Sequence, residues 1–448
     1  MRFQERAARL HEALLKPVDI AGLVAFRVMF GLVLVWETSR YFSHGWISRY
    51  WIAPELNLPY PGFGWLPHLP AAGMYGSWAV IGLLAVLVTL GAAYRLAAPL
   101  LALAFTYQFL LEQARYLNHF YFIILILGLL AIVPAHRQWS VDAALRPAIR
   151  SDYVPAWALW LLRFQVGVMY FYAGVAKLAP DWLAGEPMRM WLADRADFPV
   201  LGPFFTEPAA GLVAAWLGTA LDLLAVPLLL YRRTRVLALV ALAGFHLLNA
   251  RLFIIGVFPV LAMAGTLIFC EPDWPRRLLR LPAPGRRAAA GPPNGYGRGV
   301  AALLGVYVVV QLMLPLRHYA YPGDVNWTEE GHRFSWHMKL RTKSGEVIYA
   351  VTDRASRQQW LVDPRDRLET WQYADVATHP QLILQYAHEL AHRWASYGLD
   401  GVEVRARTMV SLNGRNPAPL IDPTVDLAAI DRCRMPGCIL PLNEPLRR

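Results

Sequence analysis

The sequence predicts a mainly α-helical membrane protein, with about nine transmembrane helices followed by a small extracytoplasmic α+β domain. Three observations predict this class. Hydrophobic residues occupy 56% of the 448 positions, whereas soluble domains average roughly 45–50%. These residues gather in runs that approach the roughly 20 residues needed to cross a bilayer. After residue 316 the pattern changes to short segments in which polar and apolar residues alternate.

The apolar runs define the expected helices. They lie at 20–38, 77–94, 96–113, 118–134, 155–178, 209–230, 235–250, 252–269 and 299–316. Very short turns separate the second run from the third and the seventh from the eighth. We therefore predict a transmembrane domain over 1–316, in which a segment rich in Pro, Gly, Ala and Arg, 272–298, is a flexible cytoplasmic linker.

Arginine placement orients these helices. If the N-terminus is cytoplasmic, every loop predicted to be cytoplasmic is basic: Arg95; Arg137, Arg146 and Arg150; Arg232 and Arg233; Arg276, Arg277, Arg280, Arg286 and Arg287. The opposite loops carry fewer basic residues. The positive-inside rule then predicts a multi-pass protein of the bacterial inner membrane with a cytoplasmic N-terminus. The net charge of +11 reflects this topology, and no basic stripe predicts nucleic-acid binding.

The segment 317–448 is predicted to be the extracytoplasmic domain, because an odd number of spans follows a cytoplasmic N-terminus. Segments 332–353 and 403–412 alternate as half-buried strands do, and 379–398 is helical in pattern. Cys433 and Cys438 are close enough in sequence to form a disulfide in an oxidising compartment.

Three charged residues lie within the apolar runs, where charges are costly. Arg27, Arg163 and Asp222 fall at similar depths when residues are counted from the inner ends of their helices. We interpret them as a structural ion pair, Asp222 with Arg163 or Arg27, that fixes helix packing, because a guanidinium is a poor proton carrier.

A second set of polar residues lies at the outer ends of the helices. Individually, an end lysine extends toward the interface and a lone histidine satisfies a buried hydrogen bond. Together they offer a base, two imidazoles and amide donors at one membrane face, which is what a membrane-embedded reaction site needs. The set comprises Glu37, Gln108, Asn118, His119, Tyr170, Tyr172, Lys177, His246 and Asn249.

Lys177 could act as a base in this set. Burial in apolar surroundings favours the neutral amine, which can accept a proton at neutral pH. A substrate reached from the outer leaflet would be a lipid-soluble acid, and a hydroquinone fits. The sequence has no dinucleotide, haem or iron–sulfur motif and no metal-site pattern, so we expect no metal and electrons supplied by the substrate itself.

These residues lie in segments that resemble the vitamin K-dependent gamma-glutamyl carboxylase family. The segment "YFYAGVAKLAPDW", from Tyr170, resembles the one that holds the family's catalytic lysine. Other matching blocks follow in the same order along nearly the whole chain: "PVDIAGLVAFRVMFG", "LNHFYF", "WSVDAALR", "FHLLNARLFIIGVF", "FCEPDWPRRL", "NWTEEGHRFSWHM" and "VSLNGRNPAPLIDPTVDL". The chain looks like a bacterial member that carries the family's horizontally transferred transmembrane (HTTM) domain.

The resemblance implies a function. Lys177 would deprotonate vitamin K hydroquinone, which reacts with O2 to give a strongly basic oxygenated intermediate. That intermediate would remove a γ-proton from a peptide glutamate and end as the epoxide, and the carbanion would take up CO2. His119 matches the family's second catalytic residue, and His246 and Phe258 match positions near the quinone. Asn118, Tyr170 and Asn249 also match and are predicted to bind quinone.

Two departures keep alternatives open. Ala176 stands where the animal enzymes have a second lysine, and those enzymes continue well beyond the last matching block. One alternative is a menaquinol epoxidase without carboxylation, and another is a non-catalytic membrane scaffold. The expected partners are the lipid bilayer, the quinone and a Glu-containing secreted or periplasmic peptide. No internal repeat favours a transporter.

Overall fold

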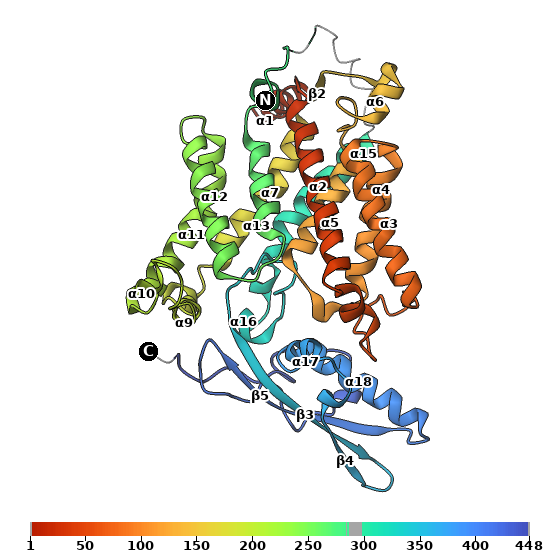
Figure 1. Ribbon diagram of the computed structural model, residues 1–448. Coiled ribbons are helices and arrows are strands. Elements are labelled where there is room, and N and C mark those ends of the chain that lie inside the picture. The colour runs from red at the N-terminus through yellow and green to blue at the C-terminus, as the bar shows by residue number, and fades with distance from the viewer. Residues whose placement is uncertain (1, 284, 286–297, 447–448) are drawn as a thin grey trace.

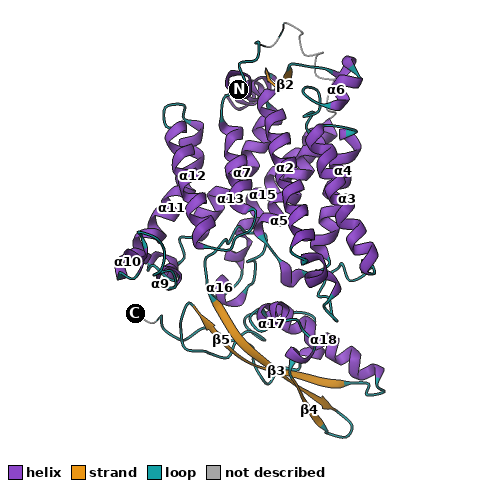
Figure 2. Ribbon diagram, viewed as in Figure 1, coloured by secondary structure: helices purple, strands orange, loops and turns teal. Residues whose placement is uncertain are grey.

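The computed structural model describes residues 2–283, 285 and 298–446. A bundle of helices is followed by a small region with strands, which lies beneath one end of the bundle (Figure 1, Figure 2). A mainly helical protein with a small sheet near its C-terminus agrees with the predicted fold class.

Each predicted apolar run contains a helix. The helices are α2 (Ala21–Ser43), α3 (Ala71–Leu90), α4 (Tyr94–Leu110), α5 (Asn118–Ile132), α7 (Trp157–Ala176), α11 (Pro208–Leu230), α12 (Arg235–Leu252), α13 (Phe258–Thr266) and α15 (Arg298–Met313). Among the described residues, six stretches are both long and apolar enough to cross a membrane: α2, α3, α7, α11, α12 and Ala302–Ala320. The stretches Asn118–Ile132 and Phe258–Phe269 are shorter apolar helices.

The surfaces of the outer helices are apolar. Leu217 and Leu224 on α11, and Leu237 and Val240 on α12, are exposed, whereas α7 has a largely buried face in the middle of the bundle. Contiguous exposed apolar surface of this kind is uncommon on a soluble monomer. The pattern is that of a helical membrane protein whose outer helices face lipid.

The run predicted over 252–269 begins later than expected. The helix α12 continues to Leu252 and α13 starts only at Phe258. Between them Gly256 has a left-handed backbone, with φ of +59°, a conformation that L-residues other than glycine avoid. The prediction of one continuous helix from residue 252 is therefore wrong, and the loop between α12 and α13 enters the site described below.

Small elements close the end of the bundle that carries the N-terminus (Figure 1). They are α1 (Arg2–Leu15), α6 (Val141–Leu145), α14 (Trp274–Leu278) and the antiparallel strands β1 (Pro17–Asp19) and β2 (Tyr153–Pro155). Arg276 of α14 is buried, and its Nε and Nη2 lie 2.8 Å and 3.1 Å from carboxylate oxygens of Asp19 and Asp152. The first part of the predicted flexible linker is thus a docked helix, and residues 284 and 286–297 lie outside the described residues.

The opposite end carries α8 (Pro180–Leu183), α9 (Met188–Ala193), α10 (Gly202–Phe205), α16 (Val325–Thr328) and the sheet. The sheet is antiparallel in the order β4-β3-β5, with β3 (Lys343–Asp353), β4 (Gln359–Val362) and β5 (Val402–Leu412). Helices α17 (Thr370–Val376) and α18 (Pro380–Ser396) complete this region. Short turns of other helix types lie at Ser48–Ile52, Gln113–Arg115, Pro147–Ile149, Leu267–Phe269, Leu314–Ala320, Pro364–Asp366 and Leu427–Ala429.

Burial alternates along β3 and β5 as a one-sided sheet requires. Val347, Tyr349 and Val351 on β3 pack with α18 in one apolar core. The bounds of α18 and β5 confirm the helix predicted over 379–398 and the strand predicted over 403–412. Residues 332–342 are turns and loop rather than the strand expected there. Cys433 and Cys438 form a disulfide in this region.

Candidate active site

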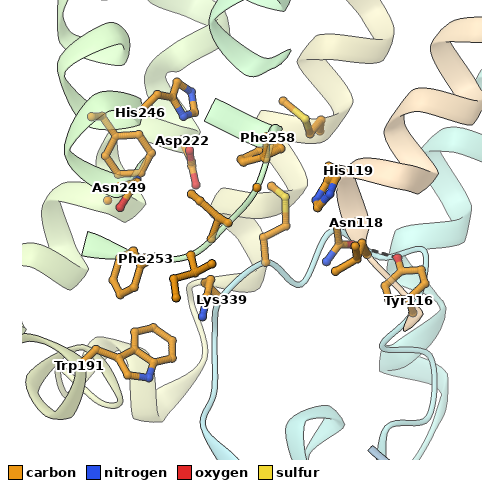
Figure 3. Close-up of a pocket in the computed structure, with 18 of the residues that line it drawn as sticks. Tyr116, Asn118, His119, Trp191, Asp222, His246, Asn249, Phe253, Phe258 and Lys339 are labelled. Carbon is orange, nitrogen blue, oxygen red and sulfur yellow. Dashed lines mark hydrogen bonds between the residues drawn. The ribbon is translucent and has the colours of Figure 1, made fainter. Parts of the chain in front are cut away.

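A cavity of about 520 Å³ lies at the end of the bundle nearest the sheet. Figure 3 shows it from the side, with α5 on one wall and the α11–α13 region on the other. All seven residues predicted as catalytic or quinone-binding line this cavity: Asn118, His119, Tyr170, Lys177, His246, Asn249 and Phe258. The fold therefore brings together residues that the sequence placed only at a common depth, while their roles stay predictions.

Lys177 caps the C-terminal end of α7 and its side chain is buried. Its Nζ lies 2.5 Å from Asp222 Oδ2 and 3.4 Å from the Ala173 carbonyl oxygen. The ring of Trp182 is 5.5 Å from the same nitrogen, and the indole N–H donates to Ala215 O and Thr219 Oγ1. Lysine is thus held between a carboxylate and an aromatic face, at the wall of the cavity.

The predicted structural ion pair is wrong. Asp222 pairs with Lys177, and both residues line the cavity. Arg27 donates instead to the carbonyl oxygens of Ala135 and Trp139, and Arg163 to those of Ile268 and Cys270.

Helix offset explains the error. A Cβ on Gly174 of α7 would lie 2.7 Å from the side chain of Leu223, so the last turn of α7 packs against the middle of α11. The end of α11 nearest the sheet region extends further, where Gly211 packs against Arg189 of α9. The predicted depths were counted from the predicted inner ends of α7 and α11, on the assumption that these two ends lie at one level. Because they do not, Asp222 faces Lys177.

Two imidazoles face the cavity on either side of Phe258. The Phe258 ring centroid is 6.4 Å from that of His119 and 5.9 Å from that of His246 (Figure 3). His246 Nε2 forms a 2.6 Å hydrogen bond with the Tyr170 hydroxyl, and both residues are buried. Within the described part of the chain, the His119 ring has no hydrogen-bond partner, so its nitrogens remain available to a ligand.

The Asn118 side chain, unlike the His119 ring beside it in sequence, is hydrogen-bonded to protein. Its Nδ2 donates to the His337 carbonyl oxygen, and its Oδ1 accepts from the Tyr116 hydroxyl, which in turn accepts from the Phe334 N–H. Both groups of the Asn118 amide are therefore bonded to protein. The network ties the start of α5 to the segment 334–339, whereas Asn249 lines the cavity without a side-chain hydrogen bond to another described residue.

The other polar residues predicted at the outer face divide into two kinds. Glu37 lines the cavity and pairs with Arg40 at 2.6 Å. Gln108 donates to Ser77 Oγ, and the Tyr172 hydroxyl donates to the Leu312 carbonyl oxygen. Neither of these two side chains belongs to the cavity, so depth alone selected them wrongly.

The cavity also contains residues that sequence reasoning missed. Met338 ends the "NWTEEGHRFSWHM" block and Lys339 follows it, and Arg115, Trp191 and Phe253 complete the same wall region. Segment 334–339 is unusual, since Phe334, Trp336 and Lys339 all have positive φ, at 62°, 61° and 49°. Such conformations cost of order 1–3 kcal/mol each in non-glycine residues and gather at functional sites. The sequence carries no periodic signal for a segment of this kind.

The residues after Lys177 are anchored to the sheet region. Asp181 accepts two hydrogen bonds from the Arg415 guanidinium, at 2.5 Å and 2.8 Å, and one of 2.7 Å from Asn413 Nδ2. Burial alone would raise the pKa of Asp181, but these hydrogen bonds outweigh it and hold the pKa below its ordinary value. Two sequence blocks, around Lys177 and around Asn413, therefore meet in space.

Comparison with known proteins gives two family matches. Residues 15–274 match the HTTM domain, and residues 297–444 match the lumenal domain of the vitamin K-dependent gamma-carboxylase. No solved structure matches the chain. The first match includes every residue of the Lys177 site except those that come from the segment around Lys339.

Proposed function

The chain belongs to the vitamin K-dependent gamma-carboxylase family, and from this premise we propose that it oxidises vitamin K hydroquinone with O2 and uses the base so formed to carboxylate peptide glutamate. The observation that carries the proposal is the buried Lys177–Asp222 pair, which lines one cavity with His119. The volume of about 520 Å³ lies within the range of about 300–1,000 Å³ typical of small-molecule sites. No metal takes part in the proposed chemistry.

The carboxylate beside Lys177 changes how the lysine would act. The Asp222 carboxylate lies 2.5 Å from Lys177 Nζ, and a lysine that is paired as an ammonium cannot accept a proton. Lys177 can still deprotonate a hydroquinone hydroxyl if it passes its own proton to Asp222 as it receives the new one. The pair then changes from neutral overall to a single positive charge, which balances the hydroquinone anion formed beside it.

His119 would stabilise that anion. Its ring has no hydrogen bond to another described residue, and it lines the cavity with its centroid 6.4 Å from that of Phe258. A preorganised donor in a site that excludes water stabilises developing negative charge strongly. The hydroquinone anion would supply, through its reaction with O2, the strong base that removes the glutamate γ-proton, and apolar walls such as Phe258 and Met169 would protect that base from solvent protons.

The test uses purified full-length protein in lipid nanodiscs with vitamin K hydroquinone, O2, labelled bicarbonate and a short Glu peptide. We expect quinone epoxide and peptide-bound label, both abolished by Lys177→Ala. Absence of both products from the wild type, or their persistence in Lys177→Ala, would refute the proposal. Arg251→Ala, which removes a positive charge on an exposed residue near the end of α12, is the matched control and should keep both activities.

A second candidate function is epoxidation of vitamin K hydroquinone or menaquinol without carboxylation. The origin of the cavity lining favours this function. Among the described residues that line the cavity, only Met338 and Lys339 come from beyond residue 316, so the region matched to the gamma-carboxylase lumenal domain contributes little to it. The same assay separates the two functions. Epoxide from either quinol with no fixed CO2, across peptides of different sequence, would leave epoxidation as the activity.

The proposed setting is the bacterial inner membrane, with nine helices crossing it, the N-terminus cytoplasmic and the sheet region outside. Arginine-rich loops at the α1 and α14 end support this orientation. The Cys433–Cys438 disulfide supports an oxidising compartment for the sheet. A membrane-impermeant thiol reagent on intact spheroplasts should label Cys433 and Cys438 only after reduction, and labelling only after lysis would refute the orientation.

A further inference from the structure

Lys339 reaches the cavity from the loop that precedes the sheet. The loop passes beneath the helix ends, and the Lys339 side chain lies at the edge of the cavity near Phe253 and Trp191 (Figure 3). Its Nζ is 5.4 Å from the centre of the Trp191 ring and 5.5 Å from that of Phe253. The two rings contact each other, with centroids 5.6 Å apart, so the ammonium lies beside a pair of aromatic side chains that also line the cavity.

The other cations of the cavity are already engaged. Lys177 pairs with Asp222, and Arg40 pairs with Glu37. The Arg115 guanidinium stacks 3.5 Å from the Tyr50 ring centre and donates to the Tyr41 hydroxyl. Within the described residues, Lys339 has neither an ion pair nor a hydrogen bond to its ammonium.

The position of Lys339 is fixed by its surroundings. Its backbone is left-handed, and the fully buried Trp336 precedes it by three residues. The Asn118–His337 hydrogen bond holds the same segment against α5. Neighbouring protein also removes water from the ammonium and lowers its pKa, although the side chain remains accessible. An ordinary surface lysine is neither held nor desolvated in this way.

A partly desolvated cation that has no anionic partner among the described residues favours an anion that enters the site. The helix-end wall supplies the groups that act on the quinol, and Lys339 faces the same cavity from the side of the sheet region. Trp191 and Phe253 would pack against the methylene groups of a side chain that carries the anion.

We propose that Lys339 binds the side-chain carboxylate of an acidic peptide substrate and positions the glutamate at the mouth of the Lys177 cavity. The inference rests on the proposed function for the identity of the peptide. It concerns binding and specificity, so Lys339 is a positioning residue that does not itself move a proton of the quinol.

The test measures binding of a short Glu peptide and the matched Gln peptide to the full-length protein in nanodiscs, without quinone, by the change in tryptophan fluorescence. We expect the wild type to bind the Glu peptide at least about tenfold more tightly, the scale of a charge-assisted hydrogen bond. Lys339→Met should abolish this preference, and Lys339→Arg should restore most of it. Lys16→Met, which removes one positive charge from an exposed site at the other end of the bundle, should keep it.

Equal affinity of the wild type for the two peptides, or an unchanged Glu preference in Lys339→Met, would overturn the inference. A wild type that forms no epoxide but still prefers the Glu peptide through Lys339 would refute the proposed function and leave this binding site in place. Thermal melting of each variant separates a loss of binding from a loss of folding. If Lys339→Met does not fold, Lys339→Gln replaces it, and an unchanged Glu preference in that variant would equally overturn the inference.

Discussion

Lys177 Nζ and Asp222 Oδ2 lie 2.5 Å apart where the last turn of α7 meets the middle of α11. The two residues are 45 positions apart in sequence and both are buried. A buried charge is costly without a partner, so each residue accounts for the presence of the other. The pair, rather than the lysine alone, is the group that can take a proton from a bound hydroquinone.

Replacing Asp222 tests this view. Asp222→Asn removes the group that would receive the lysine proton, and we expect epoxide formation to fall by about 100-fold, the lower range for losing a general acid–base group. Asp273→Asn removes an exposed acid of similar kind, paired with Arg277 at the other end of the bundle, and should leave the rate unchanged. Full activity in Asp222→Asn would show that Lys177 works alone.

His119 should matter for the rate more than for quinone binding. If its free ring stabilises an oxyanion, His119→Ala should lower kcat for epoxide formation by about 10²–10³-fold with little change in the KM for quinol. His392→Ala, at an exposed position of α18, is the control histidine. A change in KM alone would assign His119 to binding instead.

Gly256 gives a test of cavity shape. A Cβ there would lie 3.9 Å from His119 Nε2 and from the Arg40 guanidinium, and φ is +59°. Gly256→Ala should destabilise the fold by about 1–2 kcal/mol through backbone strain and should also lower epoxide formation. Gly62→Ala is a matched control, because Gly62 has φ of +83° and open space around it.

The two glycine variants should lose similar stability in thermal melts, and only Gly256→Ala should lose activity beyond what its stability explains. Equal activity of the two variants would mean that the loop between α12 and α13 does not shape the site.

Asp181 predicts a pH dependence of stability. Its folded-state pKa is lowered, so the carboxylate form stabilises the contact with Arg415 and Asn413. This stabilisation is complete above the unfolded pKa of about 3.9 and is lost as the pH falls through the lower folded value. Asp181→Asn should cost about 1.5–3 kcal/mol at pH 7, measured by thermal unfolding.

The difference between wild type and Asp181→Asn should shrink as the pH falls below about 3.9, because the unfolded chain then takes up a proton that the folded carboxylate accepts only at its lower pKa. A difference that stays constant over this range would exclude Asp181 as the titrating group. Asp400→Asn, which removes an exposed acid between α18 and β5, controls for a general effect of losing one negative charge.

Much of the helical fold followed from local sequence. Apolar runs predicted where the membrane helices lie, and alternation predicted β5 and the whole of β3. The segment 332–342 was predicted as strand, but it is a series of turns with left-handed residues. Alternation of residue types does not reveal such a conformation, because tertiary contacts such as Asn118 with His337 impose it.

The sequence by itself indicated that residues such as His119, Lys177 and Asn249 gather at one end of the bundle, because helix pitch converts position along a run into depth. The tertiary structure alone decided which of them meet. The offset between α7 and α11 moved Asp222 from a packing role to the side of Lys177, and the folded loop brought Lys339 to the same cavity. Both outcomes depend on contacts between segments far apart in the chain, which no local pattern of residues encodes.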